Sequence, residues 1–276
     1  MMKNKLDTIN LLVSLDENYI PQLNVLLTSI ALNNPGETIS LYLMHSGISK
    51  EKLLNIKDQC EKYGYIFNSV LVSPNLFINS PCSKRYPKEM YYRLLSPIIL
   101  PNNIDRVIYL DPDILVINPL RPLWETDLKG NIFAAASHTG TTKLANNVNK
   151  IRLGTENEYF NSGVLLIDLK KGRDEIIPDE IFKYAENHFK ELILPDQDIL
   201  NALYGGRILN LDDYIWNYDA RNYGTYLLQS SGVSDLSWIM KNTVILHFCG
   251  KSKPWKPGYI YRFGILYKHY MNIANR

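Results

Sequence analysis

Apolar and polar positions alternate along the first eighty residues in blocks that predict strands and helices in turn. Three continuous apolar runs are typical of buried strands: residues 8–15, 37–46 and 65–72. Between them, leucine and isoleucine recur at helical spacing in residues 18–34. Residues 49–64 form an amphipathic helix pattern, with Ser49 placed to cap it and Gly64 to end it. This alternation predicts a largely parallel sheet with helices on both faces.

Beyond residue 80 the pattern breaks into shorter elements, because half of the fourteen prolines fall between residues 81 and 122. Further apolar runs predict strands at residues 105–110, 159–171 and 242–248. Short helices are predicted at residues 87–100 and 195–206, the second closed by glycine. No repeat, low-complexity tract or linker divides the chain, so we expect one domain of the α/β class.

The composition is that of an ordinary globular protein. The chain has 276 residues, of which 46% are hydrophobic and 21% charged, enough to bury a substantial core. Its cysteines, Cys60, Cys82 and Cys249, are widely spaced, which argues against a disulfide framework or a zinc ribbon and predicts buried or semi-buried thiols. Neither a signal peptide nor a membrane-spanning run is recognisable, so we expect a soluble cytoplasmic protein. A net charge of +2 gives no indication of a nucleic-acid partner.

The charge is unevenly distributed along the chain. Residues 251–276 hold six basic residues and no acidic ones, together with six aromatic residues. One interpretation of this tail is peripheral contact with the anionic inner face of a membrane. The other is a packed C-terminal helix with a solvated basic face. The pattern favours neither.

Two aspartates follow the apolar run at residues 105–110, one residue apart. Asp111 stands at the carboxyl end of that strand, where ligands bind in open α/β sheets. Pro112 favours extended backbone, which would direct the side chains of Asp111 and Asp113 to the same side. Two carboxylates this close repel each other unless a cation lies between them, so the pattern predicts a hard divalent metal. The alternative is that Asp111 caps a turn and Asp113 is solvated.

His247 repeats this arrangement, since it too ends an apolar run. An imidazole beside two carboxylates suits Mn²⁺ somewhat better than Mg²⁺. Gly250 permits close approach of the backbone to a ligand, while Lys251 and Lys253 are point-charge partners for phosphate. Together these residues indicate a metal–diphosphate site. A buried histidine with an ordinary hydrogen-bond partner is the alternative for His247 alone.

Four motifs resemble glycosyltransferase family 8, which includes glycogenin-like enzymes and bacterial lipopolysaccharide glucosyl- and galactosyltransferases. They are YLDPDILV at 109–116, YFNSGVLLIDL at 159–169, PDQDILN at 195–201 and HFCGKSKPW at 247–255. The resemblance implies a GT-A fold, a single Rossmann-like catalytic domain at residues 1–255, followed by the tail at 256–276. It also implies transfer of glucose or galactose from a UDP-sugar to a saccharide or glycolipid acceptor, with Mn²⁺ and with retention at the anomeric carbon.

The resemblance assigns roles to individual residues. The metal would be bound by Asp111, Asp113 and His247. The UDP-sugar donor would contact Asp16, Asn18, Tyr19, Arg93, Asp111, Asn161, Gly250 and Lys253. Asp196 and Gln197 match positions at the donor sugar, which they would orient and whose positive charge they would stabilise. Many members carry an acidic residue just after a small-residue strand that matches residues 132–137; here Ser137 and His138 are the candidates to replace it.

The expected mechanism follows from the weak nucleophilicity of an amide. Gln197 is a poor candidate for double displacement, so we expect the acceptor hydroxyl to attack on the face that UDP leaves. A sugar-1-phosphate nucleotidyltransferase is one rival function, but it needs a glycine-rich basic loop after the first strand, where this chain has SLDENY. A protein that binds nucleotide sugars without turnover is the other rival, and no sequence feature excludes it.

Overall fold

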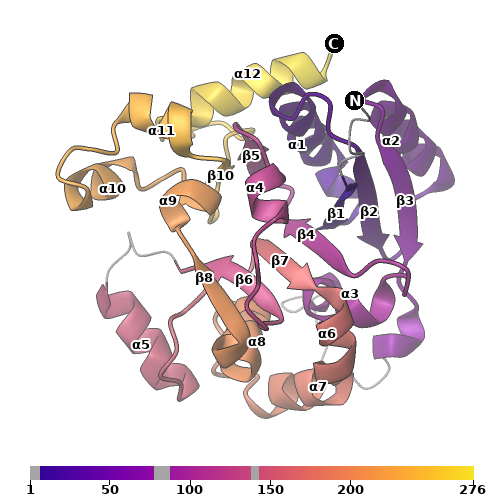
Figure 1. Cartoon of the computed structure of the whole chain (residues 1–276), viewed down its shortest axis with the longest axis vertical. Helices are drawn as coiled ribbons and strands as arrows, with labels where there is room; N and C mark the ends of the chain where they lie inside the picture. Colours follow the sequence, from indigo (N-terminus) through magenta and orange to yellow (C-terminus); the bar gives the residue numbers. More distant parts are fainter. Residues whose placement is uncertain (1–6, 78–87, 138–142) are drawn as a thin grey trace, which may run out of the picture.

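The computed structural model describes residues 7–77, 88–137 and 143–276. At its centre lies a seven-stranded sheet in the order β3-β2-β1-β4-β7-β6-β8 (Figure 1). Its strands are β1 (Ile9–Ser14), β2 (Ile39–His45), β3 (Ile66–Leu71), β4 (Arg106–Leu110), β6 (Phe133–Ala136), β7 (Val164–Asp168) and β8 (Ile208–Leu211). Only β7 runs antiparallel to its neighbours β4 and β6. The predicted α/β class and mostly parallel sheet are confirmed.

Helices pack against both faces of this sheet. One core cluster holds side chains of α1 (Ile20–Asn33), α2 (Lys50–Lys62) and α4 (Arg121–Trp124), and another holds those of α3 (Tyr92–Ile99), α6 (Leu169–Glu175), α7 (Pro178–Asn187) and α8 (Pro195–Tyr204). Strand β1 contributes Leu11 and Val13 to the first cluster and Leu12 to the second, because successive side chains of a strand point to opposite faces. As predicted, Ser49 caps α2: its hydroxyl accepts the Lys52 N–H at 3.4 Å.

A second, smaller sheet lies beside the carboxyl end of β4. It consists of β5 (Ile114–Val116), β10 (Ile245–His247) and β9 (Tyr218–Asp219), with β10 in the middle. Around it are α9 (Asp213–Trp216), α10 (Tyr223–Gln229), α11 (Leu236–Asn242) and α12 (Gly264–Ala274), while α5 (Lys143–Leu153) lies beyond β6 and β8 (Figure 1). Short 3₁₀ segments are η1 (Glu17–Tyr19), η2 (Pro74–Phe77), η3 (Lys88–Tyr91) and η5 (Gly205–Arg207).

Two predicted strands are wrong in their extent. The strand expected at 159–171 is confined to β7, because Asp168 ends it by accepting the Lys171 N–H at 2.8 Å and so capping α6. The strand expected at 242–248 begins only at Ile245, because α11 continues to Asn242. The helix expected at 87–100 is α3, and its first turn is the 3₁₀ segment η3.

The basic aromatic tail packs against the rest of the protein. Phe263 and Tyr267 are buried in a third core cluster, which also contains side chains of α1 and β5. The Tyr270 hydroxyl accepts a hydrogen bond from Asn33 Nδ2 at 2.9 Å, while Lys268 is exposed. The structure therefore has the packed helix with a solvated basic face that was one of the two interpretations of this segment. None of the helices in the described part of the chain is long and apolar enough to cross a membrane.

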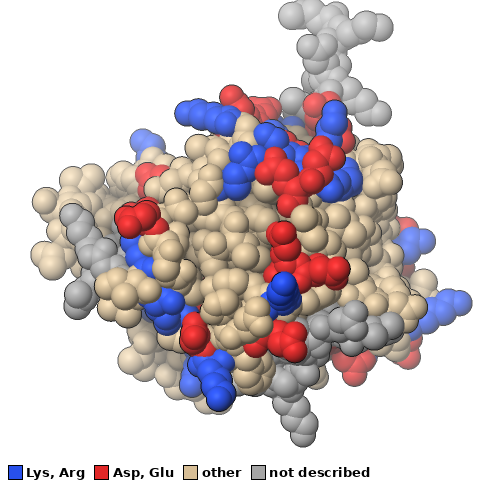
Figure 2. Space-filling view, turned by 90° about the horizontal axis from the view of Figure 1, so that it is seen from below, with Lys and Arg blue, Asp and Glu red and all other residues tan. Residues whose placement is uncertain are grey.

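Figure 2 shows Lys and Arg side chains interspersed with Asp and Glu over the face that it presents. Charges of both signs are therefore mixed on this face.

Candidate active site

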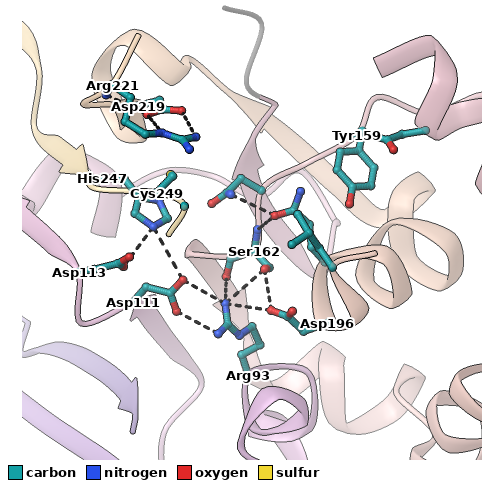
Figure 3. Close-up of a pocket in the computed structure, with 15 residues that line it drawn as sticks. Arg93, Asp111, Asp113, Tyr159, Ser162, Asp196, Asp219, Arg221, His247 and Cys249 are labelled. Atoms are coloured by element: carbon teal, nitrogen blue, oxygen red, sulfur yellow. Dashed lines mark hydrogen bonds and ion pairs between the residues drawn. The ribbon is translucent and has the colours of Figure 1, made fainter. Parts of the chain in front are cut away.

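The predicted metal ligands converge where the two sheets meet. Asp111 follows β4, Asp113 precedes β5, and His247 ends β10, which pairs antiparallel with β5 so that His247 lies opposite Ile114. His247 Nε2 is 3.2 Å from Asp113 Oδ1 and 3.9 Å from Asp111 Oδ2 (Figure 3). One ligand atom from each of the three side chains lies within 4.8 Å of the others. The strand pairing therefore brings together residues that are far apart in the sequence.

The backbone between the two aspartates differs from the prediction. Pro112 and Asp113 form a turn rather than a continuation of extended chain, and this turn leads directly into β5. Proline is well suited to such a turn because its φ angle is fixed near −65°. The two carboxylates still converge, because the turn reverses the chain beside the carboxyl end of β4.

Arg93, on α3, joins the two acidic groups at the base of the site. Its Nη2 lies 3.0 Å from Asp111 Oδ1 and its Nη1 lies 3.2 Å from Asp196 Oδ2 (Figure 3). The same Nη1 donates to the carbonyl oxygen of Ser162 at 2.9 Å. The Tyr109 hydroxyl donates to Asp111 Oδ1 at 2.7 Å, which fixes this carboxylate from the other side. Arg93 is therefore part of the site rather than a surface arginine.

The loop before β7 contacts the first turn of α8. Ser162 Oγ donates to Asp196 Oδ2 at 2.8 Å, and Asn161 Nδ2 donates to Gln197 Oε1 at 3.0 Å. Gly163 allows this loop to approach the metal ligands closely. A Cβ atom at this position would lie 2.7 Å from Asp111 Oδ2 and closer still to the His247 ring.

Asp198, the second aspartate of the DQD motif, points away from the cavity and is fully buried. Its carboxylate accepts two hydrogen bonds from Arg152, at 2.6 and 2.9 Å, and one from the Tyr159 hydroxyl at 2.6 Å. It also accepts the backbone N–H groups of Ile193 and Leu194, which precede α8. Asp198 therefore fixes the beginning of α8 to α5, and only its neighbours Asp196 and Gln197 face the cavity.

Two cavities meet at the aspartates. The larger, of about 480 Å³, is lined by the metal-site residues, by Asn161, Asp196 and Gln197, and by Tyr159 and Arg221 on its outer walls. The smaller, of about 300 Å³, is lined by Asp16 and Tyr19 from the loop after β1. Arg93, Asp111 and Asp113 border both. The shape suits an elongated ligand whose charged middle lies at the two aspartates.

Asn18, Tyr19, Gly250 and Lys253 lie on one side of the site. A further cavity, of about 500 Å³, is lined by all four of them and by Trp255, whose ring meets that of Tyr19 edge to face. Lys253 Nζ forms an ion pair with Asp113 and donates to the Phe248 carbonyl oxygen at 2.9 Å. The lysine expected to meet a diphosphate thus stands directly beside a predicted metal ligand.

Electrostatics keep Asp113 ionised. Burial would raise the pKa of its carboxyl group, but His247 and Lys253 outweigh burial and hold this pKa below its usual range. Burial likewise opposes the charge on Arg93, whose pKa is nevertheless raised by Asp111, Tyr109 and Asp196. Asp113 is therefore held in the ionised form that binds metal.

Sequence reasoning missed several residues of the site. Ser162 lies within a motif that was noticed for its neighbour Asn161, whereas Asn217 and Arg152 lie in no motif. Asn217 is fully buried, and its Oδ1 lies 2.9 Å from His247 Nδ1. Ser137 and His138 were the candidates to replace the missing acidic residue. Ser137 is buried just after β6, and His138 lies outside the described residues. Cys82 also lies outside them.

The fold and the site together define a glycosyltransferase of the GT-A class. A sequence model described as glycosyl transferase family 8 matches residues 10–257, nearly the whole chain, so this chain belongs to glycosyltransferase family 8.

Related proteins agree with this assignment. General stress protein A of Bacillus subtilis (strain 168) is 29% identical over 267 residues, which cover 94% of this chain and 91% of that protein. The lipopolysaccharide 1,2-glucosyltransferase of Escherichia coli (strain K12) is 26% identical over 94% of this chain and 76% of its own length. The solved structure of the galactosyltransferase LgtC in complex with donor and acceptor sugar analogs superposes with a TM-score of 0.79, at 26% identity and 96% coverage of both chains.

Proposed function

We propose that this protein transfers a hexose, glucose or galactose, from a UDP-sugar to a saccharide acceptor, with retention at the anomeric carbon and with a divalent metal. The observation that carries this proposal is the convergence of Asp111, Asp113 and His247 at the border between two cavities. The lipopolysaccharide glucosyltransferase among the relatives supports an acceptor that is a glycan or another cell-surface polymer.

The donor set fits a divalent cation. Two carboxylates and one imidazole, all largely buried, lie within reach of one another, and oxygen ligands with a single nitrogen suit Mn²⁺, with Mg²⁺ as the second choice. When bound there by Asp111, Asp113 and His247, the ion would supply Lewis-acid stabilisation of the charge on the leaving diphosphate.

Residues of this chain would hold the donor on both sides of that position. Asp16 and Tyr19 line the smaller cavity, which suits the nucleoside because it lies at the turn after the first strand. Lys253 and Arg93 supply positive charge at the aspartates, where the diphosphate would lie, and this charge is fixed in place before the reaction begins. The hexose would then enter the larger cavity beside Asp196 and Gln197.

Transfer would proceed by attack on the face that UDP leaves. The bond between the anomeric carbon and the UDP oxygen breaks, the acceptor hydroxyl oxygen forms the new bond, and its proton passes to the departing phosphate oxygen. The transition state resembles an oxocarbenium ion. Asp196 is placed to stabilise its positive charge, and its own carboxylate is held by Ser162 and Arg93. Trapping of a covalent glycosyl-enzyme in a mass spectrum would rule out this route.

The first test is UDP release from a panel of UDP-sugars, with and without Mn²⁺. We expect slow hydrolysis of UDP-glucose or UDP-galactose that requires metal and is lost in Asp113→Asn. Asp58→Asn is the matched control, since Asp58 is an exposed residue of α2, remote from the cavities. Metal-dependent binding of the UDP-sugar without release would favour the binding-protein alternative, and release of pyrophosphate from UTP and a sugar 1-phosphate would favour the nucleotidyltransferase.

A further inference from the structure

Two side-chain amides, those of Asn217 and Asn161, connect His247 to Gln197 across the back of the larger cavity. His247 Nδ1 lies 2.9 Å from Asn217 Oδ1, and Asn217 Nδ2 donates to Asn161 Oδ1 at 2.9 Å. Asn161 Nδ2 in turn donates to Gln197 Oε1 at 3.0 Å. Asn217 is fully buried and His247 and Gln197 are only 4% and 8% exposed, while Asn161 is half-buried and lines the cavity. This chain of hydrogen bonds links the metal site to the position proposed for the sugar.

The direction of this chain is fixed by the backbone. The N–H of Gly163 donates to Asn161 Oδ1 at 2.9 Å, and a backbone N–H has no accepting role. Asn161 must therefore present its oxygen to Gly163 and Asn217, and its nitrogen to Gln197. The Ser162 N–H lies 3.4 Å from Gln197 Oε1 and requires the same orientation of Gln197. The side-chain oxygen and nitrogen of each amide could otherwise be exchanged, and the two backbone N–H donors require the same arrangement of all three amides.

One consequence concerns His247. Because Asn217 uses its nitrogen on Asn161, its oxygen faces His247 Nδ1, which must carry a proton and donate it. The other ring nitrogen, Nε2, is left to face Asp111 and Asp113. Metal-binding histidines generally donate their second N–H to such an acceptor, which orients the ring and raises the basicity of the ligating nitrogen.

The other consequence concerns Gln197. Its oxygen is occupied by Asn161 and Ser162, so the side-chain NH₂ group is the part left to face the cavity. Gln197 therefore offers a hydrogen-bond donor to an oxygen of a bound sugar, not a carbonyl oxygen to its anomeric carbon.

We propose that Asn217 is a positioning residue for this reaction. The Gly163 N–H sets the orientation of Asn161, and Asn217 passes this orientation on to His247, so that Nε2 faces the metal. The same chain of hydrogen bonds turns the NH₂ group of Gln197 toward the sugar. This inference rests on the metal site of the proposed function. It assigns stabilisation of the oxocarbenium charge to Asp196 alone and leaves Gln197 the task of orienting the sugar.

The test compares Asn217→Leu with Asn217→Asp by titrating Mn²⁺ in the absence of nucleotide and following the free ion by electron paramagnetic resonance. The leucine has no acceptor for His247 Nδ1, and we expect its Mn²⁺ affinity to fall by about 10- to 100-fold, as for other lost partners of metal-binding histidines. The aspartate keeps an acceptor for Nδ1, so it should bind Mn²⁺ at least as tightly as the wild type. Its second oxygen faces Asn161 Oδ1, so its UDP-hexose hydrolysis should nevertheless be slower.

Asn34→Leu is the control for loss of a buried amide. Asn34 is 4% exposed and forms hydrogen bonds with the backbone of Ile30 and Leu120, at the end of the sheet opposite the active site. This variant should therefore have a lower melting temperature but bind Mn²⁺ normally. Wild-type affinity in Asn217→Leu would overturn the inference, and so would an equal loss in Asn217→Asp. If the wild type itself bound no Mn²⁺, the metal site of the proposed function would be refuted, and the inference with it; that result differs from both of the others.

Discussion

At the scale of single residues, Gly163 determines how closely the loop before β7 approaches the metal ligands. We expect Gly163→Ala to lower Mn²⁺ affinity and UDP-hexose hydrolysis, the latter by about 100-fold or more, because its Cβ atom would displace Asp111 and His247. Gly224→Ala is the control, since a Cβ atom at Gly224 meets nothing within 4 Å. Equal activity of the two variants, measured by UDP release, would show that the loop moves freely.

Cys60 gives a second test at this scale. Its thiol is fully buried, and burial, followed by the charge of Glu61, raises its pKa to about 12. Only the thiolate reacts, so native protein at about pH 8 should resist alkylation at Cys60, whereas protein in guanidinium should react readily, as an ordinary thiol of pKa about 8.5 does. The peptide that carries Cys60 can be followed by mass spectrometry, and rapid labelling of native protein would contradict the burial described here.

The same pKa shift predicts how stability depends on pH. Because the folded-state pKa of Cys60 lies above its unfolded-state value, the protonated thiol favours the folded state below about pH 8.5, and this contribution is lost as the pH rises toward 12. The guanidinium concentration at the midpoint of unfolding, followed by circular dichroism, should therefore fall in the wild type as the pH rises from about 8.5 toward 12. The fall should be smaller in Cys60→Ala, which has no thiol to titrate.

The sequence predicted the residues of the site that lie in motifs, and it missed those that support them. Asp111 and His247 each stand at the end of an apolar run, and Asp113 follows Asp111 by two residues, a pattern visible without a structure. Asn217 and Arg152 act only through contacts with distant residues, and nothing in their neighbourhood distinguishes them from other polar residues. Their roles depend on tertiary distances, which local patterns do not contain.

At the scale of elements, α8 is held in place by the ion pair between Arg152 on α5 and the buried Asp198. Asp198 is 0% exposed, so removing its partner in Arg152→Met leaves an uncompensated buried charge and should cost about 3 kcal/mol of unfolding free energy. Because Asp196 and Gln197 are on the same turn, we also expect kcat for UDP-hexose hydrolysis to fall by about 10-fold or more. The affinity for UDP should be unchanged when measured by calorimetry, because α8 does not line the cavity proposed for the nucleoside.

Arg121→Met is the matched control for this prediction. Arg121 and Glu37 also form a largely buried ion pair, with 14% and 13% of their side chains exposed. This pair lies at the end of the sheet opposite the active site. This variant should lose stability in chemical denaturation yet keep its kcat. A parallel loss of kcat in both variants would mean that reduced stability, rather than the position of α8, limits the rate.

The elements of the first half were predicted better than those of the second. Strands β1, β2 and β3 lie in a regular βαβ alternation, where apolar runs and capping residues coincide. Beyond β4, the strands β5, β9 and β10 have only two or three residues each, too few to form a periodic pattern. Their pairing, on which the metal site depends, follows from the tertiary fold.

At the scale of the whole molecule, metal and nucleotide should stabilise the folded state. A ligand that binds only the folded protein adds about 2.7 kcal/mol at a hundredfold excess over its dissociation constant, so Mn²⁺ and UDP together should raise the melting temperature by several degrees. The shift should grow with rising pH, because the negative charges around His247 raise its pKa above the ordinary value against the effect of burial, and its proton competes with the metal.

Differential scanning fluorimetry measures this shift. Asp113→Asn should show little of it, whereas Asp58→Asn should respond as the wild type does. A shift of equal size in Asp113→Asn would indicate that the nucleotide binds without the predicted metal site.

The proposed metal site joins distant parts of the chain, since β10 is both the middle strand of the small sheet and the source of His247. During synthesis the chain emerges from its amino end, and all seven strands of the large sheet are present before residue 245 is made. A nascent or prematurely terminated chain thus contains the strands of its large sheet while it still lacks one proposed metal ligand and the strand between β5 and β9. The proposed activity would arise only after His247 has been made, so that such partial copies would consume no nucleotide sugar.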